Sequence, residues 1–177
     1  MHIFSSGVGH FLDLIGQVGD SRAYMLREGR LLRLTKDHTY VQTLVDAGQI
    51  TEAEAATHRR RNLLIRAIDG VNTVEPDLSI REVHPGDRIM LCTDGLSGVL
   101  SDDEIAALVR QADPPGAVTA LVDAAIERGA PDNVTCVVAD VAEVPDTPAA
   151  NRPVVVGAAA EPRTRSQLPG VDFPQDS

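Results

Sequence analysis

Alternation of apolar and polar residues predicts β-strands at several points in the chain. Within one of them, Glu28-Gly29 is expected to form the turn of a hairpin. Another is an apolar run that follows a Pro-Gly turn and ends at Asp94-Gly95. The predicted strand segments are residues 11–20 (FLDLIGQVGD), 23–34 (AYMLREGRLLRL), 77–83 (DLSIREV), 88–95 (RIMLCTDG) and 134–141 (VTCVVADV).

Apolar residues spaced three and four apart predict helices between these strands. A first helix is expected from near Lys36 to Gly48, with Val41, Leu44 and Val45 on one face. The spacing TEAE at 51–54 and SDDE at 101–104 is that of a capping box, which starts a helix. Pro114-Pro115 is expected to end the helix that begins after Ser101. The last helix carries an apolar face and closes at Gly129; its face consists of Val118, Leu121, Val122, Ala125 and Ile126.

The order of these segments predicts the fold class. Strands come first, then helices, then a final strand, which favours an antiparallel α+β domain over a Rossmann-type alternation. Pro85-Gly86 predicts a tight antiparallel connection between the strands at 77–83 and 88–95. The single core is expected within residues 11–144, and the Pro- and Ala-rich residues 145–177 are predicted to be a flexible tail.

Composition narrows the choice of partners and compartment. A net charge of −10 and an aromatic content of 3% disfavour nucleic acid and anionic membranes as partners. The sequence has no apolar run long enough to span a bilayer and no signal peptide at its start, so a cytoplasmic location is predicted. Cys92 and Cys136 lie in apolar runs and are expected to be buried thiols in a reducing compartment, although the sequence leaves a disulfide between them open.

Three acidic residues share one pattern. Asp20, Asp94 and Asp132 each lie beside a small or turn-forming residue at the edge of an apolar segment. If the fold brings them to one end of a sheet, their mutual repulsion requires a cation. Carboxylate oxygens favour Mg²⁺ or Mn²⁺ over zinc. The pattern alone leaves ordinary structural turns as the more common alternative.

Three segments resemble motifs of a known family when taken together. VGDSRAY (18–24), CTDGLSGVL (92–100) and GAPDNVTCVVADV (129–141) resemble motifs of the metal-dependent protein phosphatase family (PPM), also called protein phosphatase type 2C. LTKDHTYVQTLVDAGQIT and NLLIRAIDG are similar to segments of its bacterial members. The resemblance is collinear over about residues 14–142 and leaves residues 1–10 unmatched.

The resemblance implies a four-layer α-β-β-α sandwich, in which helices flank two antiparallel sheets. It also implies a centre of two Mn²⁺ or Mg²⁺ ions, at which a metal-activated water attacks the phosphorus of a phosphoserine or phosphothreonine in a protein substrate. Asp94 and Asp132 match ligands of one core ion. Asp20 matches the residue that, with Asp94, holds an additional, weaker ion.

The same resemblance assigns supporting roles. Residues 38–68 match a flap near the metal cleft that is associated with substrate access. Arg22 is expected to form a salt bridge that supports the Asp20 turn, and His38 is likewise expected to be structural.

The family's fold begins with roughly a hundred residues that have no counterpart in this chain. That part carries a phosphate-contacting arginine and the aspartate that bridges both core metals, and Asp13 is no substitute because no glycine lies beside it. The resemblance therefore predicts missing N-terminal strands, exposed apolar faces, weak metal binding without the core pair, and no assigned catalytic residue. Whether the chain is an enzyme on its own is left open.

The alternative is a non-catalytic pseudophosphatase module. It would bind phosphoproteins or a Ser/Thr protein kinase through the flap and the basic residues Arg59, Arg60 and Arg61. The other interpretation of this basic run is a solvated loop.

Overall fold

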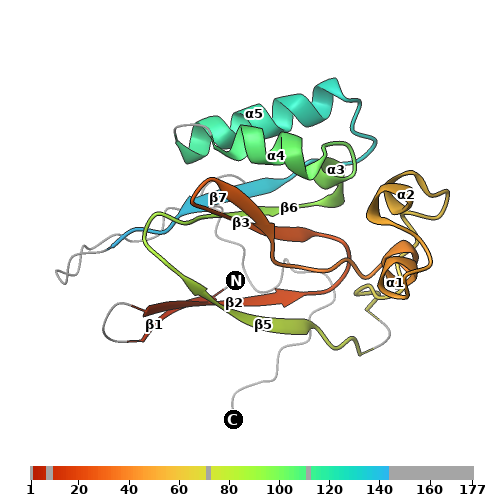
Figure 1. Ribbon diagram of the computed structural model, residues 1–177, viewed down its shortest axis with the longest axis horizontal. Helices are drawn as coiled ribbons and strands as arrows, with labels where there is room; N and C mark the ends of the chain where they lie inside the picture. Colours follow the sequence, from red (N-terminus) through yellow and green to blue (C-terminus); the bar gives the residue numbers. More distant parts are fainter. Residues whose placement is uncertain (1, 7–9, 71–72, 111–112, 144–177) are drawn as a thin grey trace, which may run out of the picture. The chain divides into compact units, whose positions relative to one another are not determined.

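The computed structural model describes residues 2–6, 10–70, 73–110 and 113–143, and only the main chain of residues up to 12. Two antiparallel sheets lie one above the other, and helices cover the outer face of one of them (Figure 1). The α+β prediction is confirmed, with three of the four expected layers present in the described residues. The tail predicted for residues 145–177 lies outside them, and its boundary stays a prediction.

The first sheet has the strand order β1-β2-β5, with β1 at His2–Ser6, β2 at His10–Gln17 and β5 at Asp77–Val83. Strand β2 lies in the middle and pairs with both neighbours, for example through Leu14 and Ile80. The N-terminal segment that the family resemblance does not cover therefore contributes an edge strand to this sheet.

The second sheet has the order β4-β3-β6-β7, with β3 at Arg22–Arg27, β4 at Arg30–Arg33, β6 at Arg88–Cys92 and β7 at Cys136–Asp140. The predicted hairpin between β3 and β4 is confirmed. Its turn residues Glu28 and Gly29 have φ values of 49° and 75°. Two successive positive φ angles match the right-handed twist of the strands that they join.

The predicted pairing of β5 with β6 is wrong. Strand β5 pairs with β2, whereas β6 pairs with β3 and β7, so the Pro85-Gly86 turn carries the chain from one sheet to the other. The buried carboxylate of Asp87 stabilises this crossing, since it accepts hydrogen bonds from the main-chain N–H of His84 (2.7 Å) and from Arg27 (2.6 Å). A short turn with Pro and Gly is compatible with either connection, which is why the local sequence did not distinguish them.

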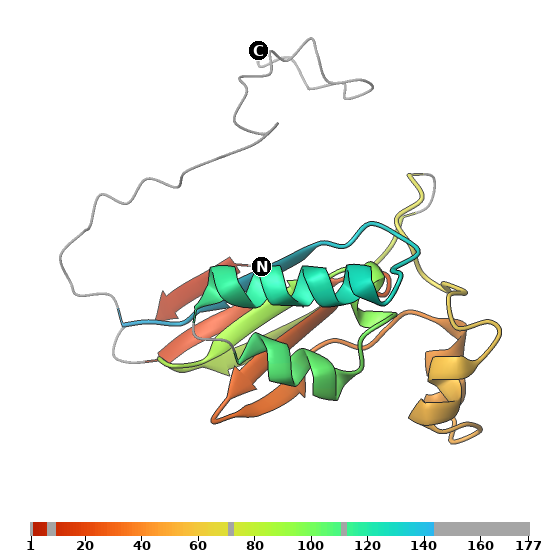
Figure 2. The ribbon, with the colours of Figure 1, turned by 90° about the horizontal axis from the view of Figure 1, so that it is seen from above.

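Helices α4 (Asp102–Val109) and α5 (Pro114–Glu127) lie across the outer face of the β4-β3-β6-β7 sheet (Figure 2). Helix α1 (Tyr40–Asp46) and helix α2 (Glu52–Thr57) lie beyond the ends of the strands. The four-residue helix α3 (Asp94–Ser97) was not predicted from the sequence. None of the helices in the described part of the chain is long and apolar enough to cross a membrane.

The helix ends test the start and stop signals in the sequence. Both capping boxes are confirmed, at Thr51 for α2 and at Ser101 for α4. Pro114-Pro115 does not end α4, which already stops at Val109, but instead starts α5. Proline suits the first turn of a helix because its missing N–H would have no partner there. Asp113 supplies the N-cap by accepting from the N–H of Gly116 at 2.9 Å.

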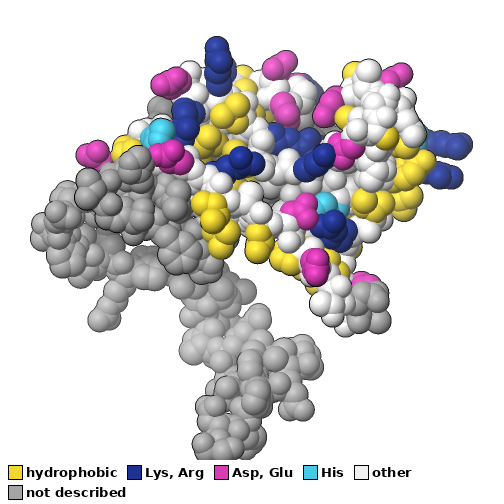
Figure 3. All heavy atoms as spheres, turned by 60° about the horizontal axis from the view of Figure 1, so that its bottom comes forward, with side chains coloured by type: hydrophobic (Ala, Val, Ile, Leu, Met, Phe, Trp, Pro, Cys, Tyr) yellow, Lys and Arg dark blue, Asp and Glu magenta, His cyan; other side chains and the backbone are white. Residues whose placement is uncertain are grey.

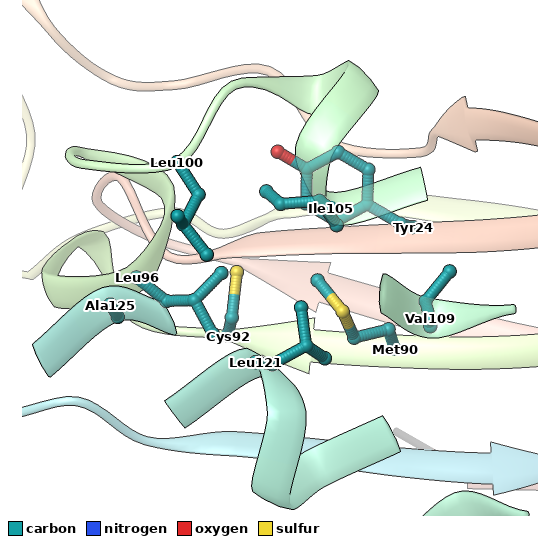
Figure 4. Close-up of a cluster of buried hydrophobic side chains, with 9 residues drawn as sticks. All are labelled: Tyr24, Met90, Cys92, Leu96, Leu100, Ile105, Val109, Leu121 and Ala125. Carbon is teal, nitrogen blue, oxygen red and sulfur yellow. The ribbon is translucent and has the colours of Figure 1, made fainter. Parts of the chain in front are cut away.

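The main core fills the space between the helices and the β4-β3-β6-β7 sheet (Figure 4). Tyr24, Leu96, Ile105, Val109, Leu121 and Ala125 are each 0% exposed. Tyr24 buries its ring but donates its hydroxyl to Asp102 at 2.9 Å, which joins β3 to the first turn of α4. Because these side chains are buried against one another, substitutions among them should have the largest effects on stability.

The outer face of the β1-β2-β5 sheet lacks such a cover in the described residues. Leu78 and Ile80 project from β5 and are 66% and 65% exposed. Figure 3 brings this side of the protein forward and shows hydrophobic side chains at its surface. Apolar exposure was expected from the resemblance, and a strand with two exposed large apolar residues is unusual for a finished sheet face.

The two faces of α5 give a test of this core. Leu121→Ala should lower the free energy of unfolding by about 3 kcal/mol, because it leaves a cavity in the core. Ile126→Ala on the same helix should cost less than about 1 kcal/mol, since Ile126 is 62% exposed. Urea unfolding of the full chain followed by circular dichroism measures both. Equal losses would mean that α5 does not pack through the Leu121 face.

Candidate metal centre

The three predicted acids lie where strands of both sheets end. Asp20 follows β2 in the connection to β3. Asp94 is the first residue of α3, two residues after the end of β6, and Asp132 lies in the turn that leads to β7. Because β3, β6 and β7 are neighbours in one sheet and β2 feeds directly into β3, these turns gather at one end of the sandwich.

The Asp20 turn is held by two buried polar side chains. Gln17 donates from its amide to the main-chain oxygens of Gly19 (3.3 Å) and Ser21 (3.1 Å), and its amide oxygen accepts from the N–H of Lys36. Gly19, which precedes Asp20, has a φ of 96°, a backbone conformation that favours glycine. The turn is thus fixed on both sides of Asp20 without use of the Asp20 carboxylate.

His38 fixes the same turn from the other side. Its main-chain N–H donates to the Gly19 oxygen (2.9 Å), and its Nδ1 accepts from the Gly19 N–H (3.1 Å). Since Nδ1 is an acceptor, the proton of the neutral ring is on Nε2, which donates to Asp77 at 3.0 Å. This bond, together with that from Arg66, lowers the pKa of Asp77. The prediction of a structural His38 agrees with these contacts.

Arg22 forms the predicted salt bridge. Its guanidinium contacts both oxygens of Asp37, with Nη2 at 2.7 Å from Oδ2 and Nε at 3.1 Å from each oxygen. The third guanidinium nitrogen, Nη1, donates to the Tyr24 hydroxyl at 3.3 Å. Arg22 therefore joins the segment that follows Asp20 to the segment that precedes His38, as a positioning residue.

The two turns that carry Asp94 and Asp132 are in contact through their main chains. A Cβ added to Gly95 would lie 3.0 Å from the carbonyl carbon of Asn133 and closer still to its oxygen. Thr93 adds three bonds: its N–H donates to the Thr135 oxygen, and its hydroxyl donates to the Asn133 oxygen (3.2 Å) and accepts from the Thr135 N–H (3.1 Å). Only glycine permits this approach of the two turns.

The negative charges of Asp20 and Asp94 interact unfavourably. Burial raises the pKa of Asp20, and the negative charge of Asp94 raises it further. The two carboxylates therefore destabilise one another when both are ionised, and a cation between them would relieve this repulsion. Asp94 and Asp132 are exposed, while Asp20 is half-buried.

The residues fit a hard cation in chemistry but only partly in arrangement. All three donors are carboxylates, which suit Mg²⁺ or Mn²⁺. However, the described residues contain no cluster of three or more His, Cys, Asp or Glu side chains close enough to hold a metal. One oxygen of Asp132 accepts from the N–H of Asn133 at 2.7 Å. The assignment of Asp20, Asp94 and Asp132 as ligands therefore stays a prediction.

Asp13 does not join this group. Its carboxyl group is fully buried on β2, and neither oxygen has a hydrogen-bond partner among the described residues. Burial raises its pKa.

A pocket of about 290 Å³ lies next to the acidic turns and is lined in part by Val18, Ser21 and Thr93.

The two ends of the predicted flap, residues 38–68, are joined by main-chain hydrogen bonds, and its first residue, His38, bonds to the Asp20 turn. The N–H groups of Tyr40 and Ile65 donate to the oxygens of Leu63 (2.8 Å) and His38 (2.9 Å), which close the segment at its base. In the basic run, Arg60 lies over the ring of Tyr40 at 5.8 Å. Arg59 and Arg61 are exposed, as the interpretation as a solvated loop expects.

The chain is similar in sequence to known protein phosphatases. No family model matches the chain. It is 47% identical over 135 residues to the serine/threonine protein phosphatase PstP of Mycobacterium tuberculosis. This match covers 76% of this chain and 26% of PstP. It is 39% identical over 123 residues to a putative protein phosphatase 2C-type of Streptococcus pyogenes, covering 69% of this chain and 50% of that protein.

The chain also resembles solved structures of protein phosphatases. The crystal structure of the PstP catalytic domain in complex with two manganese ions superposes with a TM-score of 0.69 at 43% identity, over 80% of this chain and 57% of that one. The chain is related to the metal-dependent protein phosphatases. It spans about a quarter to a half of the curated relatives quoted above.

The phosphatase motifs did not reveal every residue that positions the acids. Gln17, Thr93 and the double contact of His38 with Gly19 were missed, although each is important for the geometry of a turn. Gln17 had one sequence signal, since it is a polar residue in the same two-residue alternation as the buried Ile15. The others depend on partners distant in the sequence.

The raised pKa of Asp20 has a consequence for stability. Its ionised form is disfavoured in the folded chain, so the group costs stability above its folded pKa, and this cost vanishes as pH falls below the ordinary value of 3.8. Asp20→Asn should therefore raise Tm at about pH 7 and change it little at about pH 3. The exposed Asp103→Asn is the control. A lower Tm at neutral pH for Asp20→Asn would contradict the repulsion.

Gly95→Ala tests the contact between the two turns. The added Cβ overlaps the Asn133 main chain, so we expect a loss of about 2 kcal/mol or more in the free energy of unfolding. Gly16→Ala is the matched control, because its Cβ would meet only the end of the exposed Leu78 side chain at 3.3 Å. Chemical denaturation compares the two. If Gly95→Ala is tolerated as well as Gly16→Ala, the turns are not in contact.

Proposed function

We propose that this chain is the metal-ligand-bearing part of a serine/threonine protein phosphatase domain that hydrolyses phosphoserine and phosphothreonine in proteins. The observation that carries the proposal is the meeting of the Asp20, Asp94 and Asp132 turns, through the Asp20–Asp94 repulsion and the Gly95–Asn133 contact. These turns come from the three segments that resemble the family's motifs. The similarity to PstP, whose catalytic domain binds two manganese ions, supports the same assignment.

Each acid has a proposed role. Asp94 and Asp132 would hold one ion of a Mn²⁺ or Mg²⁺ pair, and Asp20 with Asp94 would hold an additional, weaker ion. Such ions neutralise the phosphate and activate the attacking water. Gln17, His38 and Thr93 would act as positioning residues, because they bond to the main chain of the turns. Arg22 would also position the site, through its bonds to Asp37 and Tyr24.

We propose that the chain alone binds metal weakly and turns over little substrate. The three carboxylates are not assembled into one ligand cluster in the described residues. The chain also spans only 57% of the manganese-bound catalytic domain. These 177 residues alone would then lack ligands and phosphate contacts that a whole phosphatase domain supplies.

The proposed partners are phosphorylated proteins and the Ser/Thr protein kinase that acts on them. The two free cysteines, Cys92 and Cys136, suit a reducing cytoplasm.

The alternative is a pseudophosphatase module that binds phosphoproteins without catalysis. It differs in one respect that can be measured, because its binding of phosphoproteins should not depend on Asp94 and Asp132.

A manganese titration tests the ligand set. Isothermal calorimetry on the full chain should give a Kd of about 0.1–1 mM, as expected for a site with few ligands. Asp94→Asn should weaken binding at least about tenfold, because Asp94 serves both proposed ions, and Asp20→Asn should weaken it less. Asp103→Asn, an exposed acid of α4, should have no effect. Equal affinities for wild type and Asp94→Asn would refute the assignment.

A phosphatase assay and a peptide-binding assay decide between the two candidate functions. With manganese and a phosphothreonine peptide, we expect turnover close to that of buffer. Turnover that disappears in Asp94→Ala would show the chain to be active on its own. Peptide binding that survives loss of both Asp94 and Asp132 would favour the non-catalytic module.

A further inference from the structure

The two cysteines lie directly opposite each other on neighbouring strands. In the antiparallel register of β6 and β7, Cys92 pairs with Cys136. Both are free thiols. They are 44 positions apart in the sequence but adjacent in space, an arrangement that neither the phosphatase assignment nor the metal site requires.

The hydrogen-bond pattern identifies the kind of pair. At the next position, the N–H of Thr93 donates to the oxygen of Thr135 at 3.0 Å. Antiparallel ladders alternate between hydrogen-bonded and non-hydrogen-bonded pairs, so Cys92 and Cys136 form a non-hydrogen-bonded pair. The Cα atoms of such pairs lie about 4.5 Å apart, within the range of about 4.4–6.8 Å that a disulfide spans.

Both side chains point to the same side of the sheet. Cys92 is 4% exposed and belongs to the core cluster beneath the helices (Figure 4). Cys136 packs against that cluster but is partly exposed. The pair therefore combines one buried thiol with one that a small solute can reach.

The pair also lies next to two of the acidic turns, at the end of β6 and the start of β7. Cys92 precedes Asp94 by two residues, and Cys136 follows Asp132 by four. Strand β7 is the edge strand of the described sheet and pairs only with β6 there. A bond between the cysteines would fix this edge strand to its single neighbour, next to both turns.

We propose that Cys92 and Cys136 form a reversible dithiol–disulfide site that responds to hydroperoxides. The Cys136 thiolate attacks a peroxide oxygen, the O–O bond breaks, and Cys136 becomes a sulfenic acid while the peroxide is reduced to water or an alcohol. The Cys92 sulfur then attacks the Cys136 sulfur, the S–O bond breaks, and water leaves. In total the two thiols lose two protons and two electrons. Thiol reagents restore the dithiol by exchange.

Burial sets the conditions of this reaction. It raises the pKa of the Cys136 thiol, the group that reacts with the peroxide. Since the thiolate is the nucleophile, oxidation is slow at neutral pH and accelerates as the pH rises.

Mass spectrometry of the intact full chain tests the proposal. Treatment with hydrogen peroxide should lower the mass by about 2 Da, through loss of two hydrogen atoms, and dithiothreitol should restore it. A proteolytic digest should yield one peptide pair that links Cys92 to Cys136. The oxidised chain should melt about 10 °C higher, because the bond closes a long loop in the unfolded chain.

Two variants provide controls. Cys136→Val keeps an apolar side chain of similar size on β7, and Cys92→Ala removes the buried partner; neither should lose the 2 Da or gain in Tm. The wild-type measurement needs no variant, so a folding defect in Cys92→Ala does not affect the test. Oxidation of wild type to Cys136 sulfinic acid, or to dimers linked through Cys136, without the internal bond would overturn the proposal.

Discussion

The closest approach in the candidate site is between two stretches of main chain. Gly95 lies so near the carbonyl of Asn133 that no side chain can stand between them, and Thr93 bonds to both Asn133 and Thr135. This contact brings the turn after β6 against the turn before β7, with Asp94 on one and Asp132 on the other. The position of the exposed acids thus depends on main-chain geometry, which tolerates little displacement.

The Asp20 turn is held against an electrostatic cost. Asp20 is half-buried and lies in the field of Asp94, which disfavours its charged form. Gln17 and His38 nevertheless fix the turn through neutral hydrogen bonds to its main chain, independently of the state of the carboxylate. A local arrangement that raises the energy of a charge, and is braced from both sides, is characteristic of sites that bind a partner of opposite sign.

Local signals predicted local structure well. The Glu28-Gly29 hairpin and the capping boxes at Thr51 and Ser101 were correct, since each depends on residues within one turn. The β5–β6 pairing and the end of α4 were wrong because Pro and Gly fit several connections equally well. The motifs in combination led us to expect the three acidic turns at one end of the sandwich, while the role of the acids as ligands stays a prediction. The contacts of Gln17 and His38 were not predicted, because their partners lie in other segments and no local pattern marks them.

The crossing at Pro85-Gly86 also bears on how the chain folds. Since β5 and β6 do not pair, β5 must find β2 and β6 must find β3 and β7, each far away in the sequence; only the β3–β4 hairpin pairs neighbouring segments in the second sheet. Loop closure on this scale costs entropy before any contact repays it, and such topologies fold slowly. The acidic turns, which lie at the junctions of these distant pairings, can take their final geometry only after both sheets have formed.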